Sequence, residues 1–258
     1  MRGSQIGYND LSDRGTKRLS CHHRLGLFFD SILARSAREL AQQAPLGYKP
    51  AMKTLGLDEA GRGCVLGPLV VGGFLALDED TETLRRAGAD DSKRLTHKKR
   101  VSIREALIPL GSASLREITP AEIDAGNINT LEEDAFLSLI IESRPDHVII
   151  DAPCNPRGIP AFQARLTRRL LEAGCPVPSF TIEPKADGNY PICGAASIFA
   201  KVHRDAAISA LGAVGSGYPS DPVTRAWLTE FIKNDEPFPS CVRTRWGTIE
   251  NLRQQVLS

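Results

Sequence analysis

No stretch of the 258-residue sequence is long and apolar enough to span a bilayer, which takes about 18 to 20 residues. The longest apolar run, residues 65–77, is interrupted by three glycines and a proline, so it predicts a buried strand. Internal repeats are also missing. We therefore expect a soluble protein with no membrane association.

Cysteine pairs at metal or redox spacing are absent as well. None of the six cysteines stands in a C-x-x-C pair, which argues against a zinc or redox site. The chain is too long to be a small secreted scaffold held by disulfides. Both observations favour reduced thiols and a cytoplasmic location.

The sequence has no excess of one charge: 32 basic residues face 31 acidic ones, and a net charge of +1 indicates no class of partner. With 41% hydrophobic and 24% charged residues, the composition is typical of a globular protein. It excludes collagen-like, low-complexity and wholly disordered chains. The length suggests one or two domains with a sizeable core.

The first 51 residues differ in charge from the rest. They hold six Arg and two Lys against three Asp and one Glu, a net charge of +4. Met52, the only methionine besides Met1, stands directly before the first predicted strand. We interpret residues 1–51 foremost as upstream sequence before a start at Met52, or as poorly ordered. The alternatives are a basic extension that helps to hold nucleic acid and a targeting peptide, against which the acidic residues argue.

Residues 52–258 predict one α/β domain with a mixed five-stranded sheet flanked by helices. Two strands joined by a glycine-rich turn come first, and later strands alternate with helices. Residues 212–258 predict a helical C-terminal part. The predicted strands are 55–58, 68–77, 113–118, 147–151 and 177–182, and the predicted helices are 130–143, 159–173, 192–211, 222–234 and 249–257. Active sites of such sheets gather at strand ends.

The segment 56–63, GLDEAGRG, carries the densest chemical signal. Asp58 and Glu59 stand where the first strand ends, and they serve one site only if the backbone leaves the strand there, because successive side chains alternate in direction. The glycines permit such a turn and a close approach to a ligand. A solvated turn is an equally good interpretation of this segment alone.

Two more acidic residues stand at comparable positions. Asp151 ends the apolar run 147–150, where a buried carboxylate is costly without a partner such as a metal. Asp187 precedes a long predicted helix. Singly, each is explained as a turn or helix N-cap residue. Together with Asp58 and Glu59 they form an oxygen-only ligand set that suits Mg²⁺ or Mn²⁺ and the layout of two-metal phosphodiester hydrolysis.

Taken together with further motifs, these residues make the sequence resemble type 2 ribonuclease H, the ribonuclease HII family. The resemblance runs in order from about Lys53 to Trp246 and is specific as a series. Its motifs are 56–63 with Gly67-Pro68, DSKRL at 91–95, NIN at 127–129, KAD at 185–187, AASIFAKV at 195–202, RD at 204–205 and GSGYPSDP at 215–222. The KAD and GSGYPSDP forms are most similar to archaeal and eukaryotic catalytic subunits.

The resemblance implies an RNase H-like fold and metal-dependent cleavage with two Mg²⁺ or Mn²⁺ ions. The implied substrates are RNA–DNA hybrids and ribonucleotides embedded in duplex DNA, cut on the 5′ side to leave 3′-hydroxyl and 5′-phosphate ends. DNA replication and ribonucleotide excision repair present such substrates. We expect a monomer and leave accessory protein subunits open.

The resemblance also implies roles for single residues. The family's four catalytic, metal-binding acids fall on Asp58, Glu59, Asp151 and Asp187. Its Gly-Arg-Gly turn, which reads the 2′-hydroxyl, falls on Gly61, Arg62 and Gly63. The tyrosine that stacks at the RNA–DNA junction falls on Tyr218, and polar positions that hold phosphates fall on Lys93, Asn127, Ser197 and Lys201.

Several positions depart from the family pattern or have plainer explanations. Cys64 stands where the family usually has proline, and Ala152-Pro153 follows Asp151 in place of glycine. A solvated helix surface explains Lys201 equally well. Asp205, four residues later, predicts an ordinary i,i+4 ion pair with Lys201. No departure removes a carboxylate, and the type 3 relative lacks the arginine of the Gly-Arg-Gly turn.

Other interpretations stay open. The basic groups 93–94, 98–100 and 165–169 track a nucleic-acid backbone or form solvated helix faces. A related nuclease for DNA junctions would not need a turn that reads the 2′-hydroxyl. A hybrid-binding protein without activity would bind and not turn over, although four retained carboxylates argue against it, and a scaffold role is a third possibility.

Overall fold

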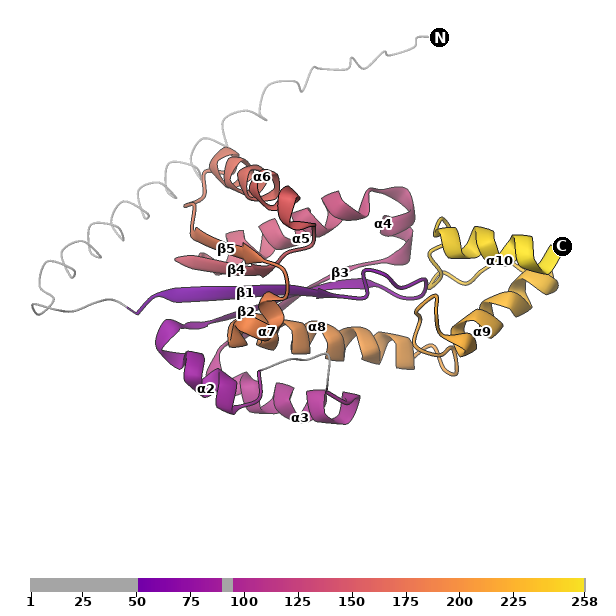
Figure 1. Ribbon diagram of the computed structural model, residues 1–258, viewed down its shortest axis with the longest axis horizontal. Helices are drawn as coiled ribbons and strands as arrows, with labels where there is room; N and C mark the ends of the chain where they lie inside the picture. The colour runs from indigo at the N-terminus through magenta and orange to yellow at the C-terminus, as the bar shows by residue number, and fades with distance from the viewer. Residues whose placement is uncertain (1–50, 90–94, 258) are drawn as a thin grey trace, which may run out of the picture. The chain divides into compact units, whose positions relative to one another are not determined.

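The computed structural model describes residues 51–89 and 95–257 and centres on a mixed sheet with strand order β3-β2-β1-β4-β5 (Figure 1). β1 (Lys53–Ala60), β2 (Leu69–Leu77) and β3 (Ser112–Ile118) form an antiparallel meander. β4 (His147–Asp151) and β5 (Ser179–Glu183) run parallel to β1. The expectation for residues 1–51 falls almost wholly outside the described residues and stays a prediction.

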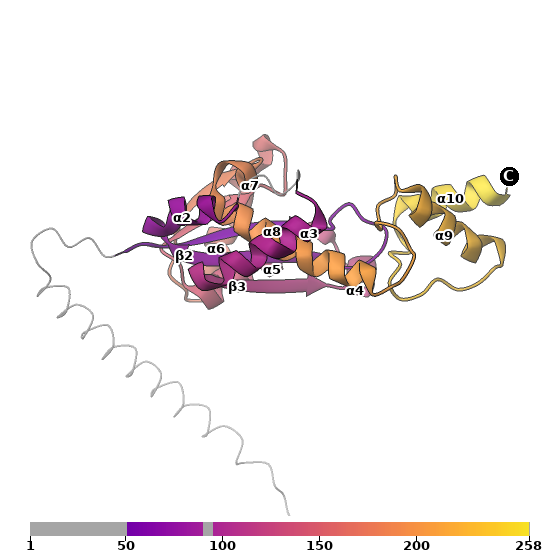
Figure 2. The same ribbon diagram turned by 90° about the horizontal axis from the view of Figure 1, so that it is seen from below.

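Helices cover both faces of this sheet. One face carries α4 (Pro120–Ala125), α5 (Ile128–Ser143) and α6 (Ile159–Glu172). The other carries α2 (Thr81–Arg86), α3 (His97–Leu107), α7 (Ala186–Asn189) and α8 (Pro191–Ser209), of which α2, α3 and α8 face the viewer in Figure 2. α9 (Pro222–Lys233) and α10 (Gly247–Leu257) pack together beyond one end of the sheet, which agrees with the predicted helical C-terminal part.

Alternating strand residues supply the two main cores. Leu55, Leu57 and Ile150 pack with α5 and α6 on one face, whereas Phe74 and Ile149 pack with α3 and α8 on the other. A third core joins the loop after β1 to the C-terminal helices through Leu66, Val242, Leu228, Ile249 and Leu252. Among the described residues, no helix is long and apolar enough to cross a membrane.

Close packing of α8 against the sheet fixes the layer that carries part of the site. Gly56 of β1 faces the backbone carbonyl of Ile192, and Gly72 of β2 faces the carbonyl of Ala196. A side chain at either glycine would overlap the helix backbone, so these strands accept only glycine here. The abundance of small residues in the predicted helix 192–211 correctly indicates this close approach.

The helices that the sequence pattern missed have few buried residues. α3 buries only Ile103 and Leu107 over eleven residues, so its apolar periodicity is weak. Short α4 follows a capping box in which Thr119 and Glu122 bond each other's backbone N–H, a signal that the sequence does contain. The five predicted strands and five predicted helices are confirmed within a few residues, and β4 matches its predicted bounds.

We predict that Gly56→Ala lowers the free energy of unfolding by about 1–3 kcal/mol or more, because the added methyl group meets backbone that cannot move aside. Denaturant unfolding measures this. Gly247→Ala is the matched control, since its Cβ would meet nothing within 4 Å. Equal stability of Gly56→Ala and wild type would refute the close-packing account.

Candidate active site

Three carboxylates converge at one edge of the sheet. Each of Asp58, Asp151 and Asp187 offers one oxygen, and these oxygens lie within 4.8 Å of one another. Asp58 and Asp187 expose only 4% and 2% of their surfaces, whereas Asp151 is half-buried. Three carboxylates held this closely, two of them away from water, repel one another unless a cation compensates their charge.

The strand register explains the meeting of Asp58 and Asp151. Leu57 of β1 pairs with Ile150 of the parallel strand β4, so the next residues of both strands are neighbours. Asp151 Oδ1 also accepts hydrogen bonds from the backbone N–H groups of Lys185 and Ala186, at 2.6 and 3.2 Å. These bonds fix the start of α7, and α7 carries Asp187 to the same place.

Glu59 reaches the same region, although β1 does not turn where we expected. The strand continues to Ala60 and stays paired with β2, so the expected departure of the backbone at Asp58 is wrong. Pairing with β4 ends at Leu57, which leaves this edge of β1 open, and side chains from both faces line the space beside it. Glu59 Oε2 is buried there without a hydrogen-bond partner among the described residues.

Burial raises the pKa of both carboxyl groups on β1. It raises the pKa of Asp58 to about 7, with Asp151 and Asp187 adding to the rise and the positive charge of Lys201 and a hydrogen bond with Ser197 opposing it. Burial, followed by the charges of Asp58 and Asp151, raises the pKa of Glu59 to about 8. Without a cation, the site therefore favours protonated carboxyl groups near neutral pH.

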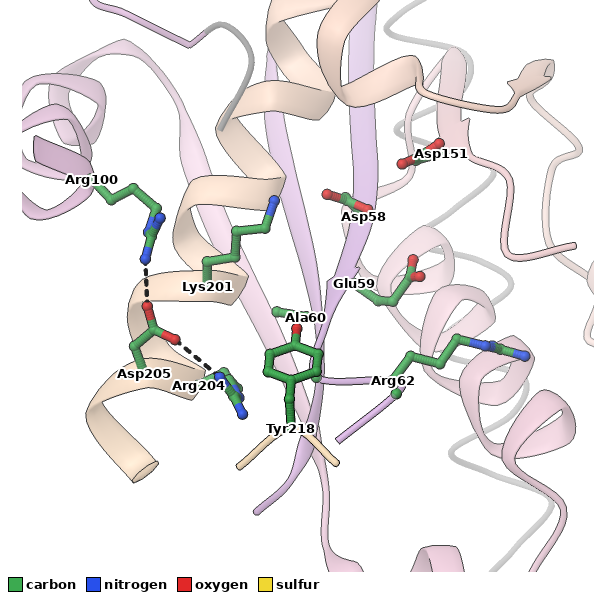
Figure 3. A pocket seen from close by; sticks show the side chains of 12 residues that line it. Asp58, Glu59, Ala60, Arg62, Arg100, Asp151, Lys201, Arg204, Asp205 and Tyr218 are labelled. Carbon is green, nitrogen blue, oxygen red and sulfur yellow. Dashed lines mark hydrogen bonds and ion pairs between the residues drawn. The ribbon is translucent and has the colours of Figure 1, made fainter. Parts of the chain in front are cut away.

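The carboxylates open into a cavity of about 390 Å³ that also holds basic and aromatic groups (Figure 3). Lys201 points towards Asp58 from α8, and its Nζ donates to Ser197 Oγ at 2.8 Å. Tyr218 stands at the rim with 43% of its surface exposed. The residues that line the cavity are Asp58, Glu59, Ala60, Gly61, Arg62, Gly63, Arg100, Asp151, Lys201, Arg204, Asp205 and Tyr218.

The Gly61–Gly63 turn lies next to the carboxylates, and side-chain bonds to α5 help to hold it in place. Gly61 has φ +86°, a left-handed conformation that glycine adopts easily. The Arg62 side chain donates to Glu132 and Asn129 of α5, and Glu132 exposes only 1% of its surface. Sequence reasoning missed Glu132; a carboxylate in the apolar pattern of the predicted helix 130–143 was the available signal.

Arg204 is a second buried group that sequence reasoning left without a role. Its guanidinium lies 5.0 Å from the centre of the Tyr218 ring and donates to the Ser216 carbonyl at 2.5 Å. It also lies 2.9 Å from the thiol of Cys64, the residue that departs from the family pattern. Arg204 therefore links the rim tyrosine to the turn after β1.

The predicted substrate residues are not all in this cavity. Asn127 caps α5, where it accepts from Asn129 N at 2.9 Å, and it lines a separate hollow with Asp124, Arg245 and Trp246. Ser197 is fully buried beside Lys201. Lys93 lies outside the described residues. The roles assigned to these residues stay predictions.

The charged residues on the helices differ in their surroundings: some pair on the surface, and one lines the cavity. Asp205 pairs with Arg100 at 2.7 Å, so the simple pairing expected with Lys201 does not describe its environment. Arg165 and Arg169 bond Glu133, and Arg168 faces Glu172, which favours a paired helix surface for this group. Arg100, from the 98–100 group, does line the cavity.

The residues present fit a hard divalent cation. All four acidic side chains offer oxygen, the ligand atom that Mg²⁺ and Mn²⁺ prefer. Glu59 Oε2 is buried and has no hydrogen-bond partner within the described part of the chain, and burial raises the pKa values of Asp58 and Glu59; a bound cation would compensate both groups. Metal binding and proton release are then coupled.

We predict that the metal-free protein becomes less stable as the pH rises from about 5 to 8. The folded-state pKa values of about 7 for Asp58 and about 8 for Glu59 exceed the ordinary 3.8 and 4.5, so the stabilisation is complete below the ordinary values and is lost as the pH rises through the raised ones. Asp58→Asn then raises the melting temperature at pH 8 in chelator by roughly 3–10 °C.

Asp221→Asn is the control, because its effect on the melting temperature should have the opposite sign. Hydrogen bonds from Ser216 and Val223 lower the pKa of Asp221 to about 2, so its stabilisation is present above the ordinary 3.8 and is lost only as the pH falls through 2. Its substitution lowers the melting temperature at pH 8. A melting temperature of Asp58→Asn that lies below wild type at every pH in chelator would contradict the account.

Comparison with known proteins identifies the family. A profile of the family described as Ribonuclease HII matches residues 55–249. Ribonuclease HII of Archaeoglobus fulgidus is 40% identical over 211 residues, which cover 78% of this chain and 97% of that protein. The crystal structure of the ribonuclease H2 from Pyrococcus horikoshii OT3 matches with a TM-score of 0.70 at 37% identity, covering 80% of this chain and 100% of that one. The chain therefore has an RNase H-like fold and belongs to the ribonuclease HII family of ribonuclease H enzymes.

Proposed function

We propose that this chain hydrolyses the RNA strand of RNA–DNA hybrids and cuts on the 5′ side of a ribonucleotide embedded in duplex DNA. The products carry 3′-hydroxyl and 5′-phosphate ends. One observation carries the proposal: the carboxylates of Asp58, Glu59 and Asp151 share a cavity with the Gly61–Gly63 turn. This arrangement supports the proposal because groups for phosphodiester chemistry and for recognition of the ribose would then lie in one site.

The four acidic residues are the proposed catalytic groups. Asp58, Glu59, Asp151 and Asp187 would hold two Mg²⁺ or Mn²⁺ ions which, when bound, supply an activated water and neutralise charge on the leaving 3′-oxygen. Lys201 supports this arrangement because its charge lowers the pKa of Asp58 and so favours the ionised carboxylate. A protein nucleophile is not needed.

The groups around the carboxylates suit the substrate. Backbone N–H groups of the Gly61–Gly63 turn can donate to a 2′-hydroxyl, the group that distinguishes ribose from deoxyribose. Arg100 and Lys201 bring positive charge to the cavity wall, where phosphates would pass. The exposed Tyr218 ring offers a stacking face for a base or sugar at the rim.

The proposed setting follows from these substrates. DNA replication and ribonucleotide excision repair both present RNA joined to DNA. The proposed location is the cytoplasm, because none of the six cysteines stands in a C-x-x-C pair and the chain is too long for a small disulfide scaffold. We propose that the chain acts there as a monomer.

The direct test is cleavage of a labelled DNA duplex with one ribonucleotide, by the full chain, with Mg²⁺, Mn²⁺ or chelator. We expect nicking 5′ of the ribonucleotide that needs the cation and that falls roughly 100-fold or more in Asp58→Asn. Asp134→Asn is the matched control, because Asp134 pairs with Arg169 on the surface of α5. Equal cutting of an all-DNA duplex would favour a DNA-junction nuclease, and binding without turnover would favour a hybrid-binding protein.

A second prediction concerns Tyr218. Tyr218→Ala should lower kcat/KM on the one-ribonucleotide duplex by about 10- to 100-fold, the range expected for one lost stacking contact. Tyr218→Phe keeps the ring and should retain most of the activity. If Tyr218→Phe loses as much as Tyr218→Ala, the hydroxyl rather than the ring face is the functional part.

A further inference from the structure

We propose that Arg243, in the segment before α10, is a positioning residue that orients the Gly61–Gly63 turn for recognition of the 2′-hydroxyl. The inference deepens the proposed function and rests on it, because that function assigns the turn to ribose recognition. Arg243 is not among the residues that line the cavity, so it would not touch the substrate. Its action would pass through the turn's backbone.

Arg243 is fully buried, and its guanidinium bonds three backbone carbonyls of the loop after β1. Nη2 donates to Gly61 O at 2.8 Å, Nη1 to Arg62 O at 3.0 Å and Nε to Gly67 O at 3.0 Å. Such a buried charge is costly unless its donors are used. All three nitrogens of the planar fork have an acceptor here, so its geometry matches the loop.

Main-chain bonds anchor Arg243 to the same loop. Its N–H donates to Val65 O at 2.9 Å, and Gly67 N donates to Cys241 O at 2.8 Å. Leu66 and Val242 form an antiparallel bridge between these bonds. The Trp246 ring lies 5.2 Å from the guanidinium carbon and completes its surroundings. The C-terminal part is thus tied to the turn by backbone and side chain together.

The direction of the carbonyls sets the direction of the N–H groups. In a planar trans peptide, the C=O and the next N–H point to opposite sides. Because the carbonyls of Gly61 and Arg62 point to Arg243, the N–H groups of Arg62 and Gly63 point away from it. Two successive N–H groups aligned in this way form a donor pair of the kind that binds an oxygen ligand.

This geometry explains why a C-terminal arginine matters for specificity. Gly61, Arg62 and Gly63 line the cavity and Arg243 does not, so we infer that the N–H groups pointing away from the guanidinium face the cavity. Without the fork, Gly61 O keeps only its bond from Cys64 N at 3.2 Å and Arg62 O loses its guanidinium donor, so the donor pair is held less firmly. Lysine keeps the charge but presents a single nitrogen that cannot bridge three carbonyls.

The test compares wild type, Arg243→Lys and Arg253→Lys as full chains. Arg253 is the matched control, because its guanidinium packs over Phe238 in the same C-terminal part. For each protein we would measure kcat/KM on the one-ribonucleotide duplex and the inhibition constant of the all-DNA duplex as competitor, both corrected for the folded fraction. The melting temperature is recorded in parallel.

We expect Arg243→Lys to lower kcat/KM on the ribonucleotide duplex by roughly 10- to 100-fold, because a displacement of about 1 Å has effects of this size. The inhibition constant of all-DNA should stay within about twofold, since nonspecific binding depends on phosphate contacts. Arg253→Lys should change neither. A purely structural role would weaken both quantities together, and that result, or wild-type kcat/KM in Arg243→Lys, would overturn the inference.

Two outcomes would prevent the comparison of wild type with Arg243→Lys: an inactive wild type and an unfolded variant. If wild type cuts no ribonucleotide-containing duplex, the proposed function fails before Arg243 is tested. If Arg243→Lys does not fold, Trp246→Leu replaces it, because this change loosens the guanidinium without removing a donor. Trp246→Leu should then lower kcat/KM on the ribonucleotide duplex with unchanged inhibition by all-DNA, and a parallel loss of both would refute the positioning role.

Discussion

Repulsion among buried carboxylates is the constraint on which the rest of this structure depends. Asp58 and Asp187 are almost fully buried, and one oxygen of each lies within 4.8 Å of one from Asp151. Folding alone gives no reason to place negative groups so close together in a region of low dielectric. The raised pKa values of Asp58 and Glu59 express the cost in the absence of a cation. A stability cost located at a cavity is typical of a functional site.

The surrounding fold holds these groups from several sides. Parallel pairing of β1 with β4 sets Asp58 beside Asp151, and the bonds of Asp151 to the start of α7 bring in Asp187. Close approach of α8 to Gly56 and Gly72 places Lys201 beside Asp58. The C-terminal part then fixes the neighbouring turn through Arg243. Each contact involves main-chain groups, so the site is preformed.

Features with a local signature were predictable from the sequence, and features made by distant pairing were not. The run 147–151 predicted both β4 and a carboxylate at its end because strand length and apolar pattern are local properties. Arg243 and Glu132 escaped prediction because their partners lie 182 and 70 residues away. The expected turn at Asp58 was wrong for the same reason, since the free edge of β1 results from where β4 ends.

Calorimetric titration of the chelator-treated chain with Mn²⁺ near pH 7, in two buffers of different ionisation enthalpy, tests the central claim most directly. If the carboxylate cluster is a cation site, binding is saturable and releases protons, because ions displace the protons held by Asp58 and Glu59. Asp58→Asn should weaken binding and reduce the released protons, whereas Asp134→Asn should match wild type. Absence of saturable binding, or binding without proton release that Asp58→Asn leaves unchanged, would contradict the account.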